Sequence, residues 1–201
     1  MLFTPVHAAN VSTVKAAIVK HSIEMGVDPA ITLSIAKTES GFRHEARSSH
    51  GAVGVFQLMP STARRMGLNP YSLDDNIKGG IMYYKSMYKM FGSMELALAA
   101  YNAGPANVKK YRAVPPFSET KRFVAKIMAD YRQFKTHPDP AMIAAKKGTP
   151  TAINGAQVLA QTPGKQAPLP MVKIEQARNL NVELIKEIPM EVEVKSQSVA
   201  I

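Results

Sequence analysis

An all-α fold, with at most one small hairpin, is what this sequence predicts. Apolar residues recur every three or four positions in several segments, as they do along the buried face of a helix. The same segments are bounded by helix-start and helix-stop residues, with Ser, Asp or Pro before them and Gly after them. Hydrophobic residues make up 46% of 201 positions, enough for the core of one ordinary domain with a further segment appended.

The first two helices are predicted over residues 11–25 and 29–39. Gly26 ends the first one, and the pair Asp28-Pro29 gives the second one an N-cap followed by a proline in its first turn. Small and polar residues then make 43–54 a loop, which is where the small hairpin would lie.

Two helices are predicted in the middle of the chain. A short one begins at Pro60 and stops before Gly67. A long one runs from a cap at Asp74 or Asp75 to residue 91, and its spacing of four and three places one apolar stripe toward the core. The stripe consists of Ile77, Ile81, Tyr84, Tyr88 and Phe91.

Three more helices complete the predicted domain. Ser93 caps a helix whose middle, residues 96–100, is apolar on all sides and therefore buried. One more short helix is expected over 105–112, and Ser118 is expected to cap the last one. The last helix carries an apolar stripe of Phe123, Ile127, Tyr131 and Phe134.

Both ends of the chain differ in composition from the domain, which we place at residues 10–136. Val6-His7-Ala8 has the small residues of a signal-peptidase site, so we interpret 1–9 as a signal-peptide remnant, with a frayed terminus as the alternative. Pro, Gly, Ala and Gln dominate after residue 137, which predicts a linker and a flexible, partly disordered C-terminal tail over 137–201. Within the tail, an isolated helix is expected over 173–187 and a strand-like or disordered end over 188–199.

Composition excludes several classes of protein. The chain has no cysteine, so it has neither disulfides nor thiolate metal sites. His44 and His50 lie in the loop without a third ligand at suitable spacing, so no metal site is predicted. No apolar run is long enough to cross a membrane. The net charge is +10, but the basic residues are scattered and match no nucleic-acid motif, which favours a solvated surface over a nucleic-acid partner.

Glu39 is the residue whose position suggests chemistry. Ile31, Ile35 and Glu39 are spaced i, i+4, i+8 and so share one helix face. A carboxylate on an apolar face loses hydration, and the negative end of the helix dipole disfavours its charge, so both effects favour the protonated acid. A protonated carboxyl near neutral pH is what a general acid requires. The alternative is a solvated charge at a helix end.

Three motifs decide between these interpretations. They are Glu39-Ser40-Gly41-Phe42, the segment 51–63 around Gln57, and the segment 99–105 with Tyr101-Asn102. Together, at this spacing and in this order, they resemble the soluble lytic transglycosylase family, which shares its fold with goose-type lysozyme. The resemblance covers roughly residues 10–135 and implies a lysozyme-like fold. Phe56 and Phe123 depart from the family's usual methionine and tyrosine. The phenol hydroxyl that is lost at Phe123 puts one hydrogen bond of the cleft in doubt.

The resemblance implies a peptidoglycan lytic transglycosylase, a lyase that acts on a polysaccharide and needs no cofactor or metal. Glu39 would be the catalytic residue, first as acid on the bond between N-acetylmuramic acid (MurNAc) and N-acetylglucosamine (GlcNAc), and then as base in forming 1,6-anhydro-MurNAc. The residues that would bind substrate or support the acid are Ser40, Ser48, Gln57, Met59, Tyr101, Asn102 and Glu119.

Other functions remain open at this point. One alternative is a lysozyme-type muramidase on the same fold, and another is a non-catalytic peptidoglycan-binding component of an envelope machine. The implied location is the periplasm, or the cell envelope reached by export. The implied partners are peptidoglycan glycan strands and, through the C-terminal tail, a secretion, conjugation or pilus assembly.

Overall fold

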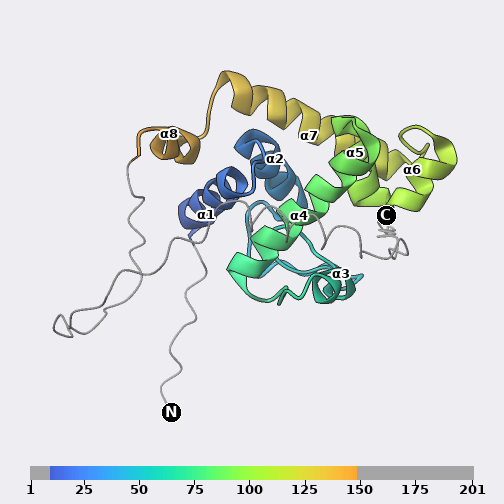
Figure 1. Cartoon of the computed structure of the whole chain (residues 1–201), viewed down its shortest axis with the longest axis horizontal. Helices are drawn as coiled ribbons and strands as arrows, with labels where there is room; N and C mark the ends of the chain where they lie inside the picture. The colour runs from blue at the N-terminus through green and yellow to red at the C-terminus, as the bar shows by residue number, and fades with distance from the viewer. Residues whose placement is uncertain (1–9, 149–201) are drawn as a thin grey trace, which may run out of the picture. The chain divides into compact units, whose positions relative to one another are not determined.

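The computed structural model describes residues 10–148, and these residues contain eight helices and no strand. The predicted all-α fold is confirmed. The helices are α1 (Val11–Glu24), α2 (Pro29–Ser40), α3 (Pro60–Arg65), α4 (Leu73–Phe91), α5 (Met94–Ala103), α6 (Pro105–Tyr111), α7 (Ser118–Thr136) and α8 (Pro140–Lys146) (Figure 1).

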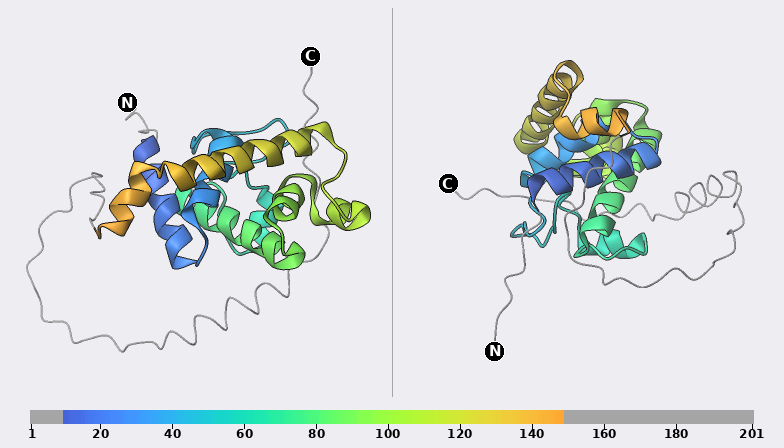
Figure 2. Two further views of the ribbon diagram at one scale, coloured as in Figure 1. Left: turned by 90° about the horizontal axis from the view of Figure 1, so that it is seen from above. Right: turned by 90° about the vertical axis from the view of Figure 1, so that its left-hand side faces the viewer.

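Helix α2 lies in the centre of the core. Asp28 caps it through a 3.0 Å bond from the Ala30 amide to the carboxylate, and Gly41 ends it in the left-handed conformation at φ 62°. Ile31 and Ile35 are completely buried, as the sequence predicts. Helix α2 packs against α1 and α7, and α5 packs against α4, α6 and α7. Figures 1 and 2 show α7 lying across this group, with α8 at its far end.

The predicted loop after α2 is confirmed, and its hairpin is reduced to two isolated antiparallel bridges, Arg47–Val53 and Val53–Leu58. Asn76 of α4 anchors this loop through hydrogen bonds to its backbone. Its amide nitrogen donates to the carbonyls of Val53 and Pro70, and its amide oxygen accepts from the Phe56 amide at 2.9 Å. The loop is thereby fixed to α4 by buried hydrogen bonds, which are costly to leave unmade.

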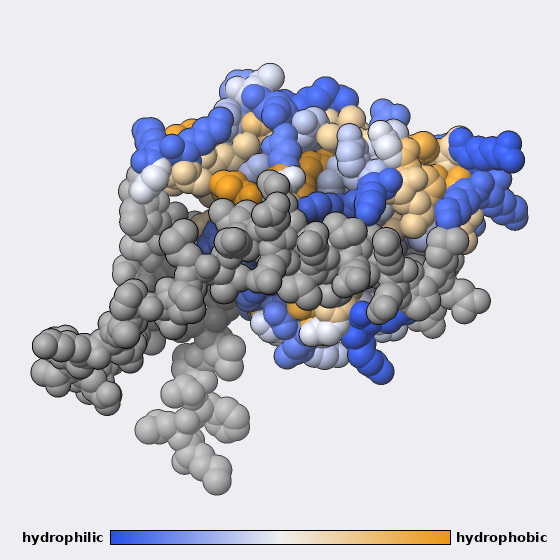
Figure 3. Space-filling model, in the orientation of Figure 1, coloured by the Kyte–Doolittle hydropathy of each residue, from blue (hydrophilic) through white to orange (hydrophobic). Residues whose placement is uncertain are grey.

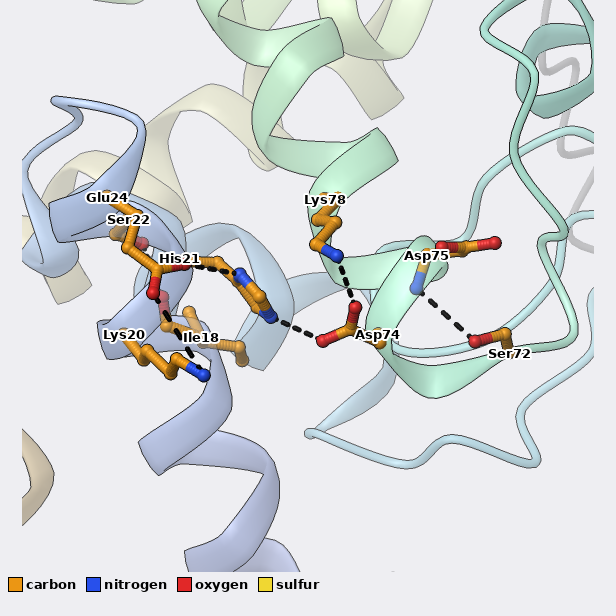
Figure 4. A network of polar contacts seen from close by, with 9 residues as sticks. All are labelled: Ile18, Lys20, His21, Ser22, Glu24, Ser72, Asp74, Asp75 and Lys78. Carbon is orange, nitrogen blue, oxygen red and sulfur yellow. Dashed lines mark hydrogen bonds and ion pairs between the residues drawn. The ribbon is translucent and has the colours of Figure 1, made fainter. Parts of the chain in front are cut away.

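Helices α1 and α4 are joined by a polar network (Figure 4). His21, only 5% exposed, contacts the Glu24 carboxylate through Nδ1 at 3.0 Å and the Asp74 carboxylate through Nε2 at 2.5 Å. Lys78 also pairs with Asp74. Hydrogen bonding from Lys78 and His21 lowers the pKa of Asp74 below its ordinary value of 3.8. The network therefore holds Asp74 in its charged form between two helices.

Three local features differ from the sequence-based expectations. The N-cap of α4 is Ser72, whose hydroxyl accepts from the Asp75 amide, so the expected cap at Asp74 or Asp75 lies inside the first turn. The N-cap of α7 is Phe117, and Ser118 is already helical. Tyr88, expected on the buried stripe of α4, is 46% exposed, because the buried face passes from Tyr84 through Met87 to Phe91 instead.

The domain also extends further than expected. Residues 140–146, assigned above to the linker, form α8, which packs against α1. Asp139 caps α8 and forms a 2.7 Å ion pair with Lys15. The interpretation of 1–9 and the expected tail elements over 173–187 and 188–199 lie outside the described residues.

Hydrophilic residues cover much of the described surface visible in Figure 3, with smaller apolar patches between them. Within residues 10–148 no helix is long and apolar enough to cross a membrane. The same residues contain no group of three or more His, Asp or Glu side chains placed to hold a metal ion.

Candidate active site

A hollow of about 230 Å³ lies where α2, α5 and α7 meet. We call it the Glu39 hollow. Helix α2 contributes the two residues before its last one, α5 contributes one residue from its last turn, and α7 contributes its first turns. Its lining residues are Thr38, Glu39, Asn102, Glu119, Arg122, Phe123 and Lys126.

Glu39 reaches this position because α2 ends directly after it. The helix continues only to Ser40, and the left-handed Gly41 then turns the chain away. Ser40 is buried and donates its hydroxyl to the Val55 carbonyl at 2.8 Å, while the Arg43 amide donates to the same hydroxyl. The end of α2 is thus tied to the loop, and Glu39 is left half-buried at the hollow.

Tyr101 lies behind the hollow and is 2% exposed. Its hydroxyl donates to the Phe56 carbonyl at 3.0 Å, and its ring stacks on Phe123 of the hollow, with centroids 6.4 Å apart. Burial raises the pKa of Tyr101 well above its ordinary value of 10.0, and the negative charge of Glu39 raises it further. Tyr101 therefore stays a neutral phenol within the electrostatic reach of Glu39.

Asn102 and Glu119 are joined across the hollow. The Asn102 amide nitrogen donates to the Glu119 carboxylate at 3.3 Å, and its oxygen accepts from the Thr120 hydroxyl at 2.7 Å. Asn102 at the end of α5 and Glu119 in the first turn of α7, which were predicted separately as site residues, thus form one network beside Glu39.

The remaining predicted residues belong to the loop rather than to the lining of the hollow. Gln57 is buried, has a positive φ of 44°, and donates its amide to the carbonyls of Gly54 at 2.9 Å and Ala46 at 3.3 Å. Ser48 accepts from the Ala52 amide at 2.9 Å. Met59 is partly exposed and caps α3 through its backbone. Gln57 and Ser48 therefore shape the loop that follows the acid.

Sequence reasoning missed three lining residues: Thr38, Arg122 and Lys126. The hydroxyl oxygen of Thr38 is buried and has no hydrogen-bond partner among residues 10–148. A signal for the other two was present, because they follow Glu119 by three and seven positions and so share its helix face.

Fold and site together define a helical domain of the lysozyme-like kind, with a single carboxyl group at the end of a core helix. A family profile described as the Transglycosylase SLT domain matches residues 16–124, which is more than half of the chain. The chain belongs to this family, and the resemblance to soluble lytic transglycosylases is confirmed.

Among its relatives, the transglycosylase of Enterobacteria phage PRD1 is 30% identical over 68% of this chain and 49% of its own length. The soluble lytic murein transglycosylase of Escherichia coli K12 is 30% identical over 61% of this chain and 23% of its own length. This chain therefore spans about half of the phage relative and about a quarter of the bacterial one.

Solved structures of lytic transglycosylases confirm the predicted lysozyme-like helical fold. Lytic transglycosylase Slt of Pseudomonas aeruginosa, solved as an inactive mutant, has a TM-score of 0.56 and 29% identity, with 63% of this chain and 25% of that chain covered. The 70 kDa soluble lytic transglycosylase of Escherichia coli has a TM-score of 0.54 and 27% identity at the same coverage.

Proposed function

We propose that this protein is a peptidoglycan lytic transglycosylase that cleaves the β-1,4 bond between MurNAc and GlcNAc and forms 1,6-anhydro-MurNAc. The observation that carries the proposal is the Glu39 hollow, where one helix-end carboxyl lies with Asn102 and Glu119. Family membership and the names of the relatives, soluble lytic murein transglycosylase among them, support the same chemistry.

In this reaction Glu39 acts twice. As an acid it gives its proton to the glycosidic oxygen while the bond from that oxygen to the muramyl anomeric carbon breaks, and the substrate's own acetamido group relieves the positive charge on that carbon. As a carboxylate it then takes the proton of the muramyl 6-hydroxyl, whose oxygen bonds to the same carbon. Glu39 ends protonated again, and no water is consumed.

The neighbours of Glu39 suit supporting roles. The buried Thr38 hydroxyl and the Asn102 amide are polar groups at the hollow that a sugar hydroxyl or acetamido group could engage. Tyr101 supports Phe123 from behind the hollow as a neutral phenol, since burial raises the pKa of Tyr101. Ser40, Gln57 and Ser48 hold the loop, and Met59 follows it as an apolar contact for the sugars.

Hydrolysis is the alternative reaction, because Glu119 is a second carboxylate at the hollow. Most glycosidases use two carboxylates, and Glu119 brings a second one to the hollow. Its hydrogen bond from Asn102 favours a binding role over that of a nucleophile or base. A hydrolase would use water where the transglycosylase uses the 6-hydroxyl.

For location and partners, we infer action in the periplasm or elsewhere at the cell envelope, where peptidoglycan lies. We further infer that the C-terminal tail connects the domain to a secretion, conjugation or pilus assembly. Deleting residues 149–201 should then leave cleavage of isolated peptidoglycan intact while abolishing co-purification with such an assembly.

The proposed reaction is tested by incubating purified peptidoglycan with the wild type or with Glu39→Gln and analysing the products. The amide cannot donate the proton, so turnover should fall at least about a hundredfold while the thermal unfolding midpoint stays unchanged. Glu45→Gln is the matched control, because Glu45 is an exposed carboxylate in the following loop. Wild-type products should weigh one water less than reducing-end fragments. Full activity of the Glu39 variant would refute the proposal, and reducing-end products would show hydrolysis.

A further inference from the structure

Two basic side chains at the Glu39 hollow have neither an ion-pair nor a hydrogen-bond partner within residues 10–148. Arg122 and Lys126 of α7 line the hollow together with Glu39 and Glu119. Both are exposed, and neither forms an ion pair or hydrogen bond with any residue in the described range 10–148. By contrast, Lys37 pairs with Asp130 at 2.7 Å and Lys135 with Asp28 at 2.9 Å, both close to α7 or on it.

The placement of Arg122 and Lys126 four positions apart destabilises α7 in the absence of a ligand. Residues four apart lie next to each other on one helix face, and like charges in that relation destabilise a helix. The carboxylate of Glu119 could pair with Arg122 one turn away, yet it accepts from Asn102 instead. The two positive charges therefore remain available to a ligand at the edge of the hollow.

We propose that Arg122 and Lys126 form a subsite for a carboxylate on the side arm of muramic acid. This rests on the proposed function and adds a specificity to it. The sugar rings of peptidoglycan are uncharged, so a negative group must come from the side arm. It is either a carboxylate of the stem peptide or, once the peptide is removed, the carboxylate of the lactyl group.

The chemistry of the hollow favours a single carboxylate over a polyanion. An arginine and a lysine one turn apart can hold one carboxylate between them, with the guanidinium offering two parallel donors. Glu39 and Glu119 line the same hollow and would repel a continuous row of phosphates. The pair therefore selects a glycan that carries an isolated carboxylate beside the bond to be cut.

The test measures binding in a Glu39→Gln background, which prevents turnover. Three ligands are compared: peptide-bearing glycan strands, strands stripped of peptides by an amidase, and neutral chito-oligosaccharides. The test variant is Arg122→Gln with Lys126→Gln. The control is Lys146→Gln with Lys147→Gln, which removes the same charge from exposed positions at the end of α8, at the opposite end of α7 from the hollow (Figures 1 and 2).

The test variant should bind peptide-bearing strands about five- to tenfold more weakly, as expected for losing two exposed charge-assisted contacts. Chito-oligosaccharide binding should not change, and the control should match the parent on all ligands. A loss confined to peptide-bearing strands assigns the subsite to the peptide, because the lactyl carboxyl is an amide there. A loss on both kinds of strand shows that the subsite accepts a peptide carboxylate and, after stripping, the lactyl carboxylate.

Equal binding by test and control variants, or an equal loss on the neutral oligosaccharide, would overturn the subsite. Failure of the proposed function looks different. In that case the protein with Glu39 intact would release no anhydro products from any strand, whatever the binding pattern of the variants.

Discussion

Asn102 shows how one side chain serves both the fold and the hollow. It is 7% exposed, accepts from the Thr120 hydroxyl at 2.7 Å and donates to the Glu119 carboxylate at 3.3 Å. The first bond ties the end of α5 to the start of α7, and the second orients a carboxylate beside Glu39. Because a buried amide must satisfy both its donor and its acceptor, the orientation of Glu119 follows from the packing of two helices.

The prediction at this scale is that Asn102→Ala reduces both stability and activity. Thr120, 2% exposed, loses its acceptor, which should lower the free energy of unfolding by about 1–3 kcal/mol. Glu119 loses its donor, so kcat/KM on peptidoglycan should fall about tenfold or more. Asn107→Ala is the control, since Asn107 makes one comparable bond to the Ala103 carbonyl outside the hollow. Equal effects of the two substitutions on kcat/KM would contradict this role.

At the scale of elements, α4 is the platform on which the loop after Glu39 rests. Gly80 lets the Phe56 ring pack directly on the helix, since a Cβ at Gly80 would lie 2.2 Å from the Phe56 Cγ. Gly79 faces the end of a side chain instead, with the Leu58 Cδ2 at 2.6 Å. The Phe56 carbonyl also accepts the hydrogen bond from the Tyr101 hydroxyl. The distance between the loop and α4 therefore determines where the acceptor for Tyr101 lies.

These two glycines give a matched test. Gly80→Ala should destabilise the protein by about 1–3 kcal/mol, because the base of the Phe56 ring cannot move without the backbone. Gly79→Ala should be close to neutral, because the Leu58 methyl can rotate and alanine gains about 1 kcal/mol in helix propensity. Chemical unfolding of both variants measures the difference. Equal destabilisation would mean that the platform does not depend on Phe56.

At the scale of the molecule, α7 has to be held over α2 for the hollow to exist. The N-cap of α2, Asp28, accepts from Lys135 at 2.9 Å and from Tyr131 at 3.3 Å, both near the end of α7. Burial alone would raise the pKa of Asp28, but the hydrogen bonds from Lys135 and the Ala30 amide outweigh it and lower the pKa below 3.8. The charged form of Asp28 is therefore the one that the folded state favours.

This linkage predicts an acid-dependent loss of stability. Because the folded pKa of Asp28 lies below its unfolded value, its contribution is complete above about pH 5 and is lost as the pH falls through the folded pKa. Asp28→Asn keeps a good N-cap but cannot carry the charge. The wild type should therefore be more stable than the variant near neutral pH, and the two thermal unfolding midpoints should approach each other as the pH falls below 3.8 and through the lowered pKa of Asp28. A constant difference across that range would contradict the assignment.

Most of the local structure could be predicted from the sequence. The helix bounds around α1, α2 and α5 follow from Gly26, Asp28-Pro29 and Ser93, because caps and breakers act on the few residues beside them. Glu39 at the end of α2 follows for the same reason. The cap of α4 was misplaced by two or three residues because Ser72, Asp74 and Asp75 are all good caps, and only the backbone chooses among them.

What the sequence by itself determined is therefore the first seven helices and the carboxyl group at the end of the second one. The tertiary structure decided which of the other polar residues lie beside that carboxyl group. It placed Asn102 and Glu119 there, turned Gln57 and Ser48 inward to the loop, and added Thr38, Arg122 and Lys126. It also extended the domain through α8, which the linker-like composition after residue 137 did not indicate. The physical reason is that caps and periodicity depend on neighbours in the chain. The hollow instead depends on how α2, α5 and α7 pack, through contacts between residues as far as 107 positions apart, as Asp28 and Lys135 are.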